Sequence, residues 1–342
     1  MRSLYLVPIS GLFSGIFLIP FTFAGANLKI SDETSMNIGG SIRAYYQDTD
    51  DEKTSNFHSI RFYIKGNVTD KVGFKIETEG KGGDMGVLDA VAKIKISDNN
   101  QIWAGRFIGP SDRANLSGSY NISSWDYPGL TSAYKTLKGG RDNGIALIGS
   151  NDNGKLSYSI GYMNGEGYDT GNYDPEDGLV SARIAYSFWD KEGYLTRSTY
   201  FGSKDVFTVG LTTMKMDDAF ASGSDFSMTM ADILIEKNLS NGSVGTFEAA
   251  FYDYDKFSAN TGDAYKLGLS YMPPGEIGLG RLQLVARYQE FSPDNNIETT
   301  RTDLGLTSVM KGHNARVGLY YQETDNGVAK TDSIKIGMQL KI

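Results

Sequence analysis

Most of the chain shows apolar and polar residues that alternate with a period of two. Near the C-terminal end, Ile334, Ile336 and Met338 are separated by single polar residues or glycine. The same alternation appears in residues 156–162 and 282–288. Because successive side chains of a strand point to opposite faces, this pattern predicts strands with one apolar and one polar face.

The length of the alternating segments separates a membrane barrel from a soluble sandwich. The segments are about ten residues long, as a tilted strand needs to cross a bilayer, whereas soluble strands cluster near five or six residues. Tyrosine and phenylalanine stand at segment ends, as in the aromatic girdles of membrane interfaces. Charged residues such as Lys93 and Arg183 lie within the polar faces, which therefore face water. The pattern predicts an all-β fold, a transmembrane antiparallel β-barrel.

We expect about sixteen strands, an even number that places both termini on the periplasmic side. Residues 194–201 could form another strand, but accepting it alone would make the number odd, so we assign 189–205 to a long turn. Polar connections such as 48–56 and 254–263 are expected to be external loops. The strands are expected near residues 36–47, 57–66, 71–80, 87–97, 100–108, 140–150, 154–164, 178–188, 206–216, 227–237, 244–253, 264–272, 281–290, 302–310, 314–323 and 332–342.

Residues 109–138 form the longest connection without clear alternation. A connection of this size in a compact fold is usually functional or disordered. It follows the fifth strand as the third external loop, and we expect it to fold inward and narrow the lumen. The alternative is a flexible loop outside the barrel.

The N-terminal residues predict export. An apolar run over residues 4–23 follows Arg2 and leads into Ala24-Gly25-Ala26, a small-x-small site of the kind that signal peptidase accepts. We expect a signal peptide over residues 1–26, cleaved after Ala26, and a barrel domain over residues 27–342. The alternative is a membrane anchor helix, because the run borders on spanning length.

Composition excludes several classes of protein. The 342 residues include 41 acidic and 33 basic side chains, a net charge of -8, which argues against nucleic-acid binding. No cysteine is present, so the sequence offers no disulfide or thiolate metal site. We find no glycine-rich phosphate loop, haem motif or metal-spaced cluster, and we expect no cofactor or metal. The two histidines, His58 and His313, are expected at opposite ends of the barrel, so we expect no catalytic site.

The polar faces carry many basic residues, and those on the first four strands should form one cationic wall. Such a wall would bias ion passage, since low-dielectric walls focus its field. Arg106 and Arg113, beside and within the long loop, are the candidates for a constriction, with Asp112 and Asp126 opposing them. The alternative is that the charges only solvate a wide lumen. The candidate pore-lining residues are Arg43, Arg61, Lys65, Lys75, Lys93, Lys95, Arg106, Arg113, Arg183, Arg287 and Arg316.

Several short stretches, in order along residues 36–342, resemble one known family. Residues 104–111 read AGRFIGPS and 141–144 read RDNG, while 286–291 read ARYQEF and 311–314 read KGHN. Asp89-Ala90, residues 156–158 and Asn164-Gly165 fit the same series. Together they resemble the phosphate-selective porin O and P family of Gram-negative outer membranes.

The resemblance implies a sixteen-stranded barrel that assembles as a homotrimer. We expect it to be embedded in outer-membrane lipid and lipopolysaccharide. It implies passive diffusion of small hydrophilic solutes and ions, with anions such as phosphate among the candidates. The dense rows of inward arginine and lysine that give the family its name are not matched residue by residue, so phosphate selectivity is not carried over. Two alternatives remain open: a structural sheath around a partner such as a multihaem cytochrome, and a surface adhesin.

Overall fold

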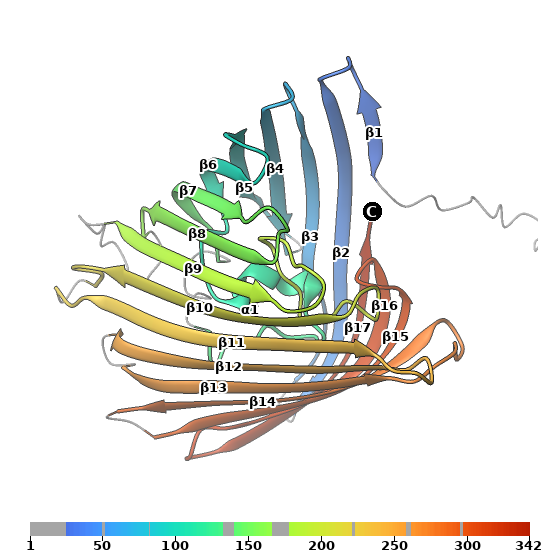
Figure 1. The fold of residues 1–342 in the computed structure, drawn as a ribbon. Helices are drawn as coiled ribbons and strands as arrows, with labels where there is room; N and C mark the ends of the chain where they lie inside the picture. The colour runs from blue at the N-terminus through green and yellow to red at the C-terminus, as the bar shows by residue number, and fades with distance from the viewer. Residues whose placement is uncertain are drawn as a thin grey trace, which may run out of the picture.

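In the described part of the chain, sixteen strands form a closed antiparallel barrel (Figure 1). The computed structural model describes residues 25–49, 52–81, 83–132, 140–165, 178–220, 223–257, 261–294 and 297–342. The barrel strands are β2 (Ser35–Thr49), β3 (Lys53–Asn67), β4 (Val72–Gly80), β5 (Met85–Lys95), β6 (Asn100–Phe107), β7 (Asp142–Ser150), β8 (Leu156–Met163), β9 (Leu179–Ser187), β10 (Val206–Met216), β11 (Phe226–Asn238), β12 (Val244–Phe257), β13 (Gly262–Met272), β14 (Arg281–Pro293), β15 (Thr299–Lys311), β16 (Ala315–Asp325) and β17 (Lys330–Lys341).

Each of the sixteen expected strands overlaps one observed strand, which confirms the predicted fold class. Residues 194–201 form no strand and lie in the connection between β9 and β10. The expected loops 48–56 and 254–263 are shorter than predicted, because β3 begins at Lys53 and β12 continues to Phe257. These strand extensions carry few apolar residues, so the alternation that marks a membrane crossing does not reveal them.

The outer face is apolar and the inner face is polar. On β17, Ile334, Ile336 and Met338 are 49%, 52% and 43% exposed, whereas Gln339 between two outward residues is fully buried. An apolar band of this extent is stable only against lipid, and polar side chains then collect on the inside. Sequence alternation thus translates directly into the two faces of the barrel.

The last strand closes the barrel against the first. Strand β17 pairs with β2 from Ser333↔Thr49 to Lys341↔Ser41. The short strand β1 (Ala26–Lys29) pairs with the remaining part of the same β2 edge, and Ala26 faces Ile38 in the register. Gly39 lies at the junction, where a Cβ atom would collide with the Tyr63 hydroxyl and the Ile342 carbonyl. Both described ends of the chain therefore meet at one end of the barrel, the periplasmic end in the expected orientation.

In the described ranges, helical structure occurs in the connection after β6. Helix α1 (Arg113–Ser117) and the 3-10 turn η1 (Ser119–Asn121) follow that strand, and both contain buried residues. Among the described residues, no helix is long and apolar enough to cross a membrane. Figure 1 shows α1 surrounded by the barrel strands. The expected signal peptide lies outside the described residues except for Gly25 and Ala26.

Candidate functional site: the barrel lumen

Residues 108–132, here called the loop insert, contact the inward-facing side chains of the barrel wall. Three wall arginines hold its backbone. Arg43 donates to the Trp125 carbonyl at 2.6 Å, Arg316 to the Ile122 carbonyl at 2.6 Å, and Arg287 to the Asp126 carbonyl at 2.8 Å. Residues 133–138, the rest of the expected inward loop, lie outside the described residues. These three predicted pore cations therefore bind the loop insert instead of facing open solvent.

Trp125 is the central side chain of this docking. Its indole is 1% exposed, and the Arg43 guanidinium lies over its ring, 4.1 Å from the centroid. His58 packs against the same ring edge-on, with centroids 5.9 Å apart. The ring also covers Gly337 of β17, where a Cβ atom would lie within 3.0 Å of indole carbons. The absence of a side chain at Gly337 thus makes room for Trp125.

Arg113 joins the loop insert to a second group of residues. It is 1% exposed, and it pairs with Asp232 of β11 (Nε–Oδ1 2.9 Å) and with Glu192 (Nη2–Oε2 2.6 Å). Arg183 of β9 contacts the other oxygen of Asp232 at 2.5 Å. Two arginines and two carboxylates thus form one buried network in which the charges balance.

Glu192 belongs to residues 188–205, here called the turn insert, which connect β9 to β10 at the periplasmic end. Burial alone would raise the pKa of Glu192, but the Arg113 guanidinium outweighs this effect and the pKa lies below its ordinary value. Farther along, Tyr194 donates its hydroxyl to the Ile108 carbonyl at 2.8 Å. The amide of Ser198 donates to the Asn121 carbonyl at 3.0 Å. The turn insert therefore packs directly on the loop insert.

Residues of the barrel wall and of a neighbouring turn also hold the turn insert by hydrogen bonds. The Glu236 carboxylate of β11 accepts the backbone N–H groups of Tyr200 (2.9 Å) and Gly202 (2.8 Å), and also the Thr199 hydroxyl (2.8 Å). His313, in the turn between β15 and β16, contacts the Thr199 carbonyl at 2.8 Å. A carboxylate that accepts several backbone donors is a strong anchor. The sequence prediction of a long turn was right in outline but missed these inward contacts.

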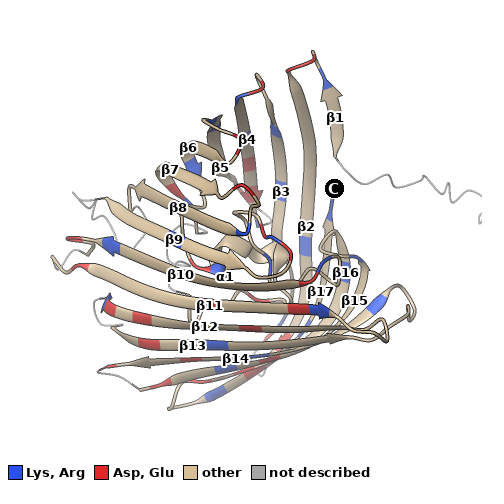
Figure 2. Cartoon of the chain, viewed as in Figure 1, with Lys and Arg blue, Asp and Glu red and all other residues tan. Residues whose placement is uncertain are grey.

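A first cavity, of about 260 Å³, lies between the loop insert and the wall formed by β2–β5 and β17. We call it the basic compartment. Lys65, Lys75, Lys93 and Lys341 line it, together with Arg61 and Arg141. Figure 2 shows basic residues on β2 and β3, while β11–β13 carry both signs of charge. The predicted cationic wall of the first four strands faces this space.

Some basic residues of this compartment are neutralised and some are not. Lys75 pairs with Glu77 and Asp89, both at 2.5 Å, and Arg61 pairs with Glu79 at 2.8 Å. Among the described residues, none of the ion pairs involves Lys65, Lys93 or Lys341. Lys93 instead lies 3.6 Å from the ring centroid of Trp103, and Lys65 lies beside the Tyr63 ring. These three lysines leave the compartment with excess positive charge.

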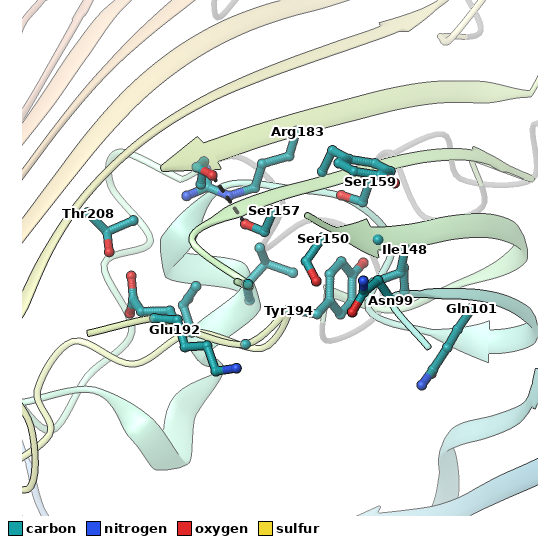
Figure 3. A pocket seen from close by; sticks show the side chains of 18 of the residues that line it. Asn99, Gln101, Ile148, Ser150, Ser157, Ser159, Arg183, Glu192, Tyr194 and Thr208 are labelled. Atoms are coloured by element: carbon teal, nitrogen blue, oxygen red, sulfur yellow. Dashed lines mark hydrogen bonds between the residues drawn. The ribbon is translucent and has the colours of Figure 1, made fainter. Parts of the chain in front are cut away.

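A second cavity, of about 320 Å³, lies between the turn insert and the wall formed by β6–β10 (Figure 3). We call it the neutral compartment. Its wall contributes Gln101, Ser150, Ser157 and Ser159, and the turn insert contributes Tyr194. Charged groups of this wall belong to the Arg113 network described above. Helix α1 and the turn insert lie between the two compartments.

One predicted site residue requires correction, and another lies at the end of the lumen. The register pairs Arg106 with Ala90 and Asn143, which places it on the outward-facing side of β6 with Ala104. Arg106 is therefore not a lumen residue, because adjacency to the long loop does not determine the face of a strand. Lys95 lies on the inner face at the periplasmic end of β5, where it pairs with Asp98 at 2.9 Å and lines a cavity with Lys65 and Lys93.

Asp112 and Asp126 were expected to lie opposite Arg106 and Arg113, but both have other partners. Asp112 accepts a hydrogen bond from Tyr252 at 2.9 Å, and Asp126 pairs with Lys335. The prediction missed Arg141, Glu192 and Lys341. A signal for Glu192 was available, since a periplasmic connection as long as 188–205 is unusual in a barrel whose other turns are short. The described residues contain no group of three or more His, Cys, Asp or Glu residues suited to a metal ion.

The sequence profile of the phosphate-selective porin O and P family matches residues 36–230. The chain belongs to this porin family. It is a channel for passive diffusion, located in the Gram-negative outer membrane. The comparison with curated protein sequences gave no significant match.

Solved structures show the same fold at low identity. An OmpT loop L8 deletion mutant from Vibrio cholerae has a TM-score of 0.65 at 13% identity, covering 91% of this chain and 100% of that chain. OprB of Pseudomonas putida at high pH has a TM-score of 0.64 at 10% identity, covering 91% and 94%. An anion-selective porin from Comamonas acidovorans has a TM-score of 0.59 at 15% identity, covering 91% and 100%.

Proposed function

We propose that this porin favours small anions, and that Lys65, Lys93 and Lys341 provide the preference. The observation that carries the proposal is the position of these lysines, which line one lumen cavity and make no ion pair among the described residues. Positive charge beside low-dielectric walls raises the local concentration of anions and lowers that of cations. Inorganic anions such as phosphate are the candidate solutes.

The other predicted cations have a different role in this proposal. Arg43, Arg287 and Arg316 bind carbonyls of the loop insert, and Arg113 and Arg183 belong to a balanced network. They shape the passage, whereas the lysines set its charge. Similarity to an anion-selective porin is consistent with this assignment but shows the fold alone.

The test is the reversal potential of single channels in a planar bilayer under a salt gradient. The variant Lys65→Gln/Lys93→Gln/Lys341→Gln should shift the reversal potential toward cation selectivity. The control Lys215→Gln/Lys256→Gln/Lys330→Gln removes the same charge from exposed lysines at the external rim. Equal shifts in the two variants would mean that net charge, and not the basic compartment, sets selectivity.

We further propose the cellular context of the barrel. Cleavage after Ala26 would leave Asn27–Lys29 to form the β1 pairing with β2, so the strand tolerates removal of the signal peptide. A homotrimer is proposed in line with the trimer form of the similar Vibrio cholerae OmpT. Acidic external segments at 48–52 and 169–177 suit divalent cations that bridge lipopolysaccharide. Blue native electrophoresis of the extracted protein tests the trimer.

The sheath alternative is not favoured. A multihaem partner would need a wide lumen, whereas the loop and turn inserts lie inside the barrel, and the two cavities beside them measure about 320 and 260 Å³. These volumes suit small solutes.

A further inference from the structure

The lumen contains a physical partition made by three side chains. Leu116 of α1 lines both compartments, Tyr194 lines only the neutral one, and Leu195 beside it lines only the basic one. Trp103 extends this partition at the wall, because its ring meets Lys93 of the basic compartment and packs edge-on against Tyr194 with centroids 5.2 Å apart. At the level of α1 the two cavities thus lie on opposite sides of packed side chains, while at the periplasmic end Gln101 shares a third cavity with Lys65 and Lys93.

The lining of the neutral compartment differs in chemistry from that of the basic one. Ser150, Ser157 and Gln101 present hydroxyl and amide groups, which both donate and accept hydrogen bonds. The Gln101 oxygen accepts from the Trp103 indole at 3.0 Å, so its amide hydrogens remain for another acceptor. Lys191 and Asp98 are exposed at the rim and have opposite signs.

The charged groups that reach this cavity are already neutralised. Arg113 and Arg183 share Asp232, and Glu192 is held by Arg113 at 2.6 Å. Glu192 also accepts the Tyr200 hydroxyl at 2.7 Å. A permeating ion gains little from such balanced, fixed groups, whereas an uncharged solute with many hydroxyls can exchange its water for the serine and amide groups.

We propose that the neutral compartment is a separate binding site for small, uncharged polyhydroxylated solutes, next to the anion path. This inference rests on the proposed function as a diffusion channel. The cavity of about 320 Å³ has the size of a pocket for a molecule such as a pentose. The turn insert, through Tyr194 and Leu195, supplies part of the wall that separates the two solute classes.

The experiment fills each compartment in turn with a large side chain. Ser157→Trp acts on the neutral compartment, and Ser41→Trp acts on the basic compartment, where Ser41 lies between Arg61 and Lys341 in the register. The full-length mature protein is reconstituted in liposomes and bilayers. The probes are arabinose uptake, measured by liposome swelling, and potassium chloride conductance with its reversal potential.

The proposal predicts a double dissociation. Ser157→Trp should slow arabinose uptake about threefold or more and leave the reversal potential unchanged. Ser41→Trp should change the reversal potential and leave arabinose uptake unchanged. If Ser157→Trp does not fold, as judged by heat-modifiable migration, Ser150→Leu tests the same wall, since Ser150 is its register partner.

Each other outcome overturns the inference in a recognisable way. Equal loss of arabinose and ion flux in both variants would show one common passage. Unchanged arabinose uptake in folded Ser157→Trp and Ser150→Leu would show that the neutral compartment carries no solute. Ion conductance without arabinose uptake in the unmodified protein would refute this inference and leave the proposed function intact, whereas no conductance at all would refute the proposed function itself.

Discussion

Arg113 of the loop insert and Glu192 of the turn insert form a buried ion pair, with Nη2 and Oε2 2.6 Å apart, inside the barrel. The two residues enter the lumen from opposite ends, because one follows β6 and the other follows β9. The pair therefore joins an external loop to a periplasmic turn. Asp232 ties both to the wall through Arg113.

Loss of this pair should loosen both inserts. Glu192→Gln keeps the size of the side chain but removes the charge that balances Arg113, and breaking a buried pair typically costs about 3 kcal/mol or more. We expect a single-channel current with frequent excursions to higher conductance. Burial alone would lower the pKa of Arg113, yet its two carboxylate partners raise it well above the ordinary value. A guanidinium keeps its proton in proteins, so in the variant Arg113 stays charged with Asp232 as its remaining partner.

The matched control is Glu276→Gln, the same change at an exposed residue of another periplasmic turn. Its current should be as quiet as that of the unmodified protein. A quiet current from Glu192→Gln as well would show that the pair does not hold the inserts in place.

Gly337 offers a test of the loop insert that changes no charge. Gly337→Ala places a Cβ atom within 3.0 Å of the Trp125 ring, so the ring must move away from the wall. We expect higher conductance and faster cleavage of the loop insert by protease in the folded barrel. Gly268→Ala is the control, because its Cβ atom would make an ordinary contact at 3.6 Å on the same inner face. Identical cleavage of the two variants would contradict the placement of Trp125.

Arg316 tests whether the wall arginines hold the loop insert. Arg316→Met removes the donor to the Ile122 carbonyl, and hydrogen bonds to charged groups contribute about 1.5–3 kcal/mol. We expect raised conductance with little change in ion selectivity. Arg281→Met is the control, since Arg281 also binds carbonyls, those of Gly242 and Pro273, but in periplasmic turns. A large shift in selectivity from Arg316→Met would show that Arg316 contacts permeating ions.

The sequence predicted the barrel well because alternation reports the face of each residue directly. Parity alone placed Arg43, Arg61 and Arg183 on the inner face, and the register of the strands agrees. The prediction was wrong for Arg106, which was chosen for its nearness to the long loop and not from its position in the alternation. Alternation therefore predicts the face of a residue reliably when the residue is assigned from its place within the strand.

The roles of the inward cations could not be predicted in the same way. Arg43 and Lys65 look alike in the pattern, yet Arg43 binds a loop carbonyl and Lys65 faces a cavity. A backbone carbonyl acceptor has no sequence signature, since every residue carries one. The inward contacts of the turn insert were missed because its anchors, such as Glu236 on β11, are distant in sequence.

Asp205 gives a pH-dependent test of the turn insert. Hydrogen bonds from the Asn238 backbone, and then from Lys237 and the Asn238 side chain, lower its pKa from 3.8 to about 2. A lowered pKa contributes stability above the unfolded value, and this stability is lost as the pH falls from about 4 to about 2. Asp205→Asn should therefore lower stability by about 1 kcal/mol at pH 7, since the site is partly exposed.

Unfolding by guanidinium, followed by tryptophan fluorescence at pH 7 and at about pH 2, measures this difference. The difference between Asp205→Asn and the unmodified protein should become much smaller at the lower pH, where most of the stability linked to the Asp205 charge is lost. A constant difference at both pH values would show that the Asp205 charge does not anchor the turn.

The most direct test of the central claim is single-channel recording of the refolded mature protein in a planar bilayer under a potassium chloride gradient. The account predicts stepwise conductance and a reversal potential on the chloride side, because Lys65, Lys93 and Lys341 leave the basic compartment positive. Phosphate added at low concentration should reduce the chloride current. A reversal potential on the potassium side would contradict the anion preference, and folded protein without conductance would contradict the open channel.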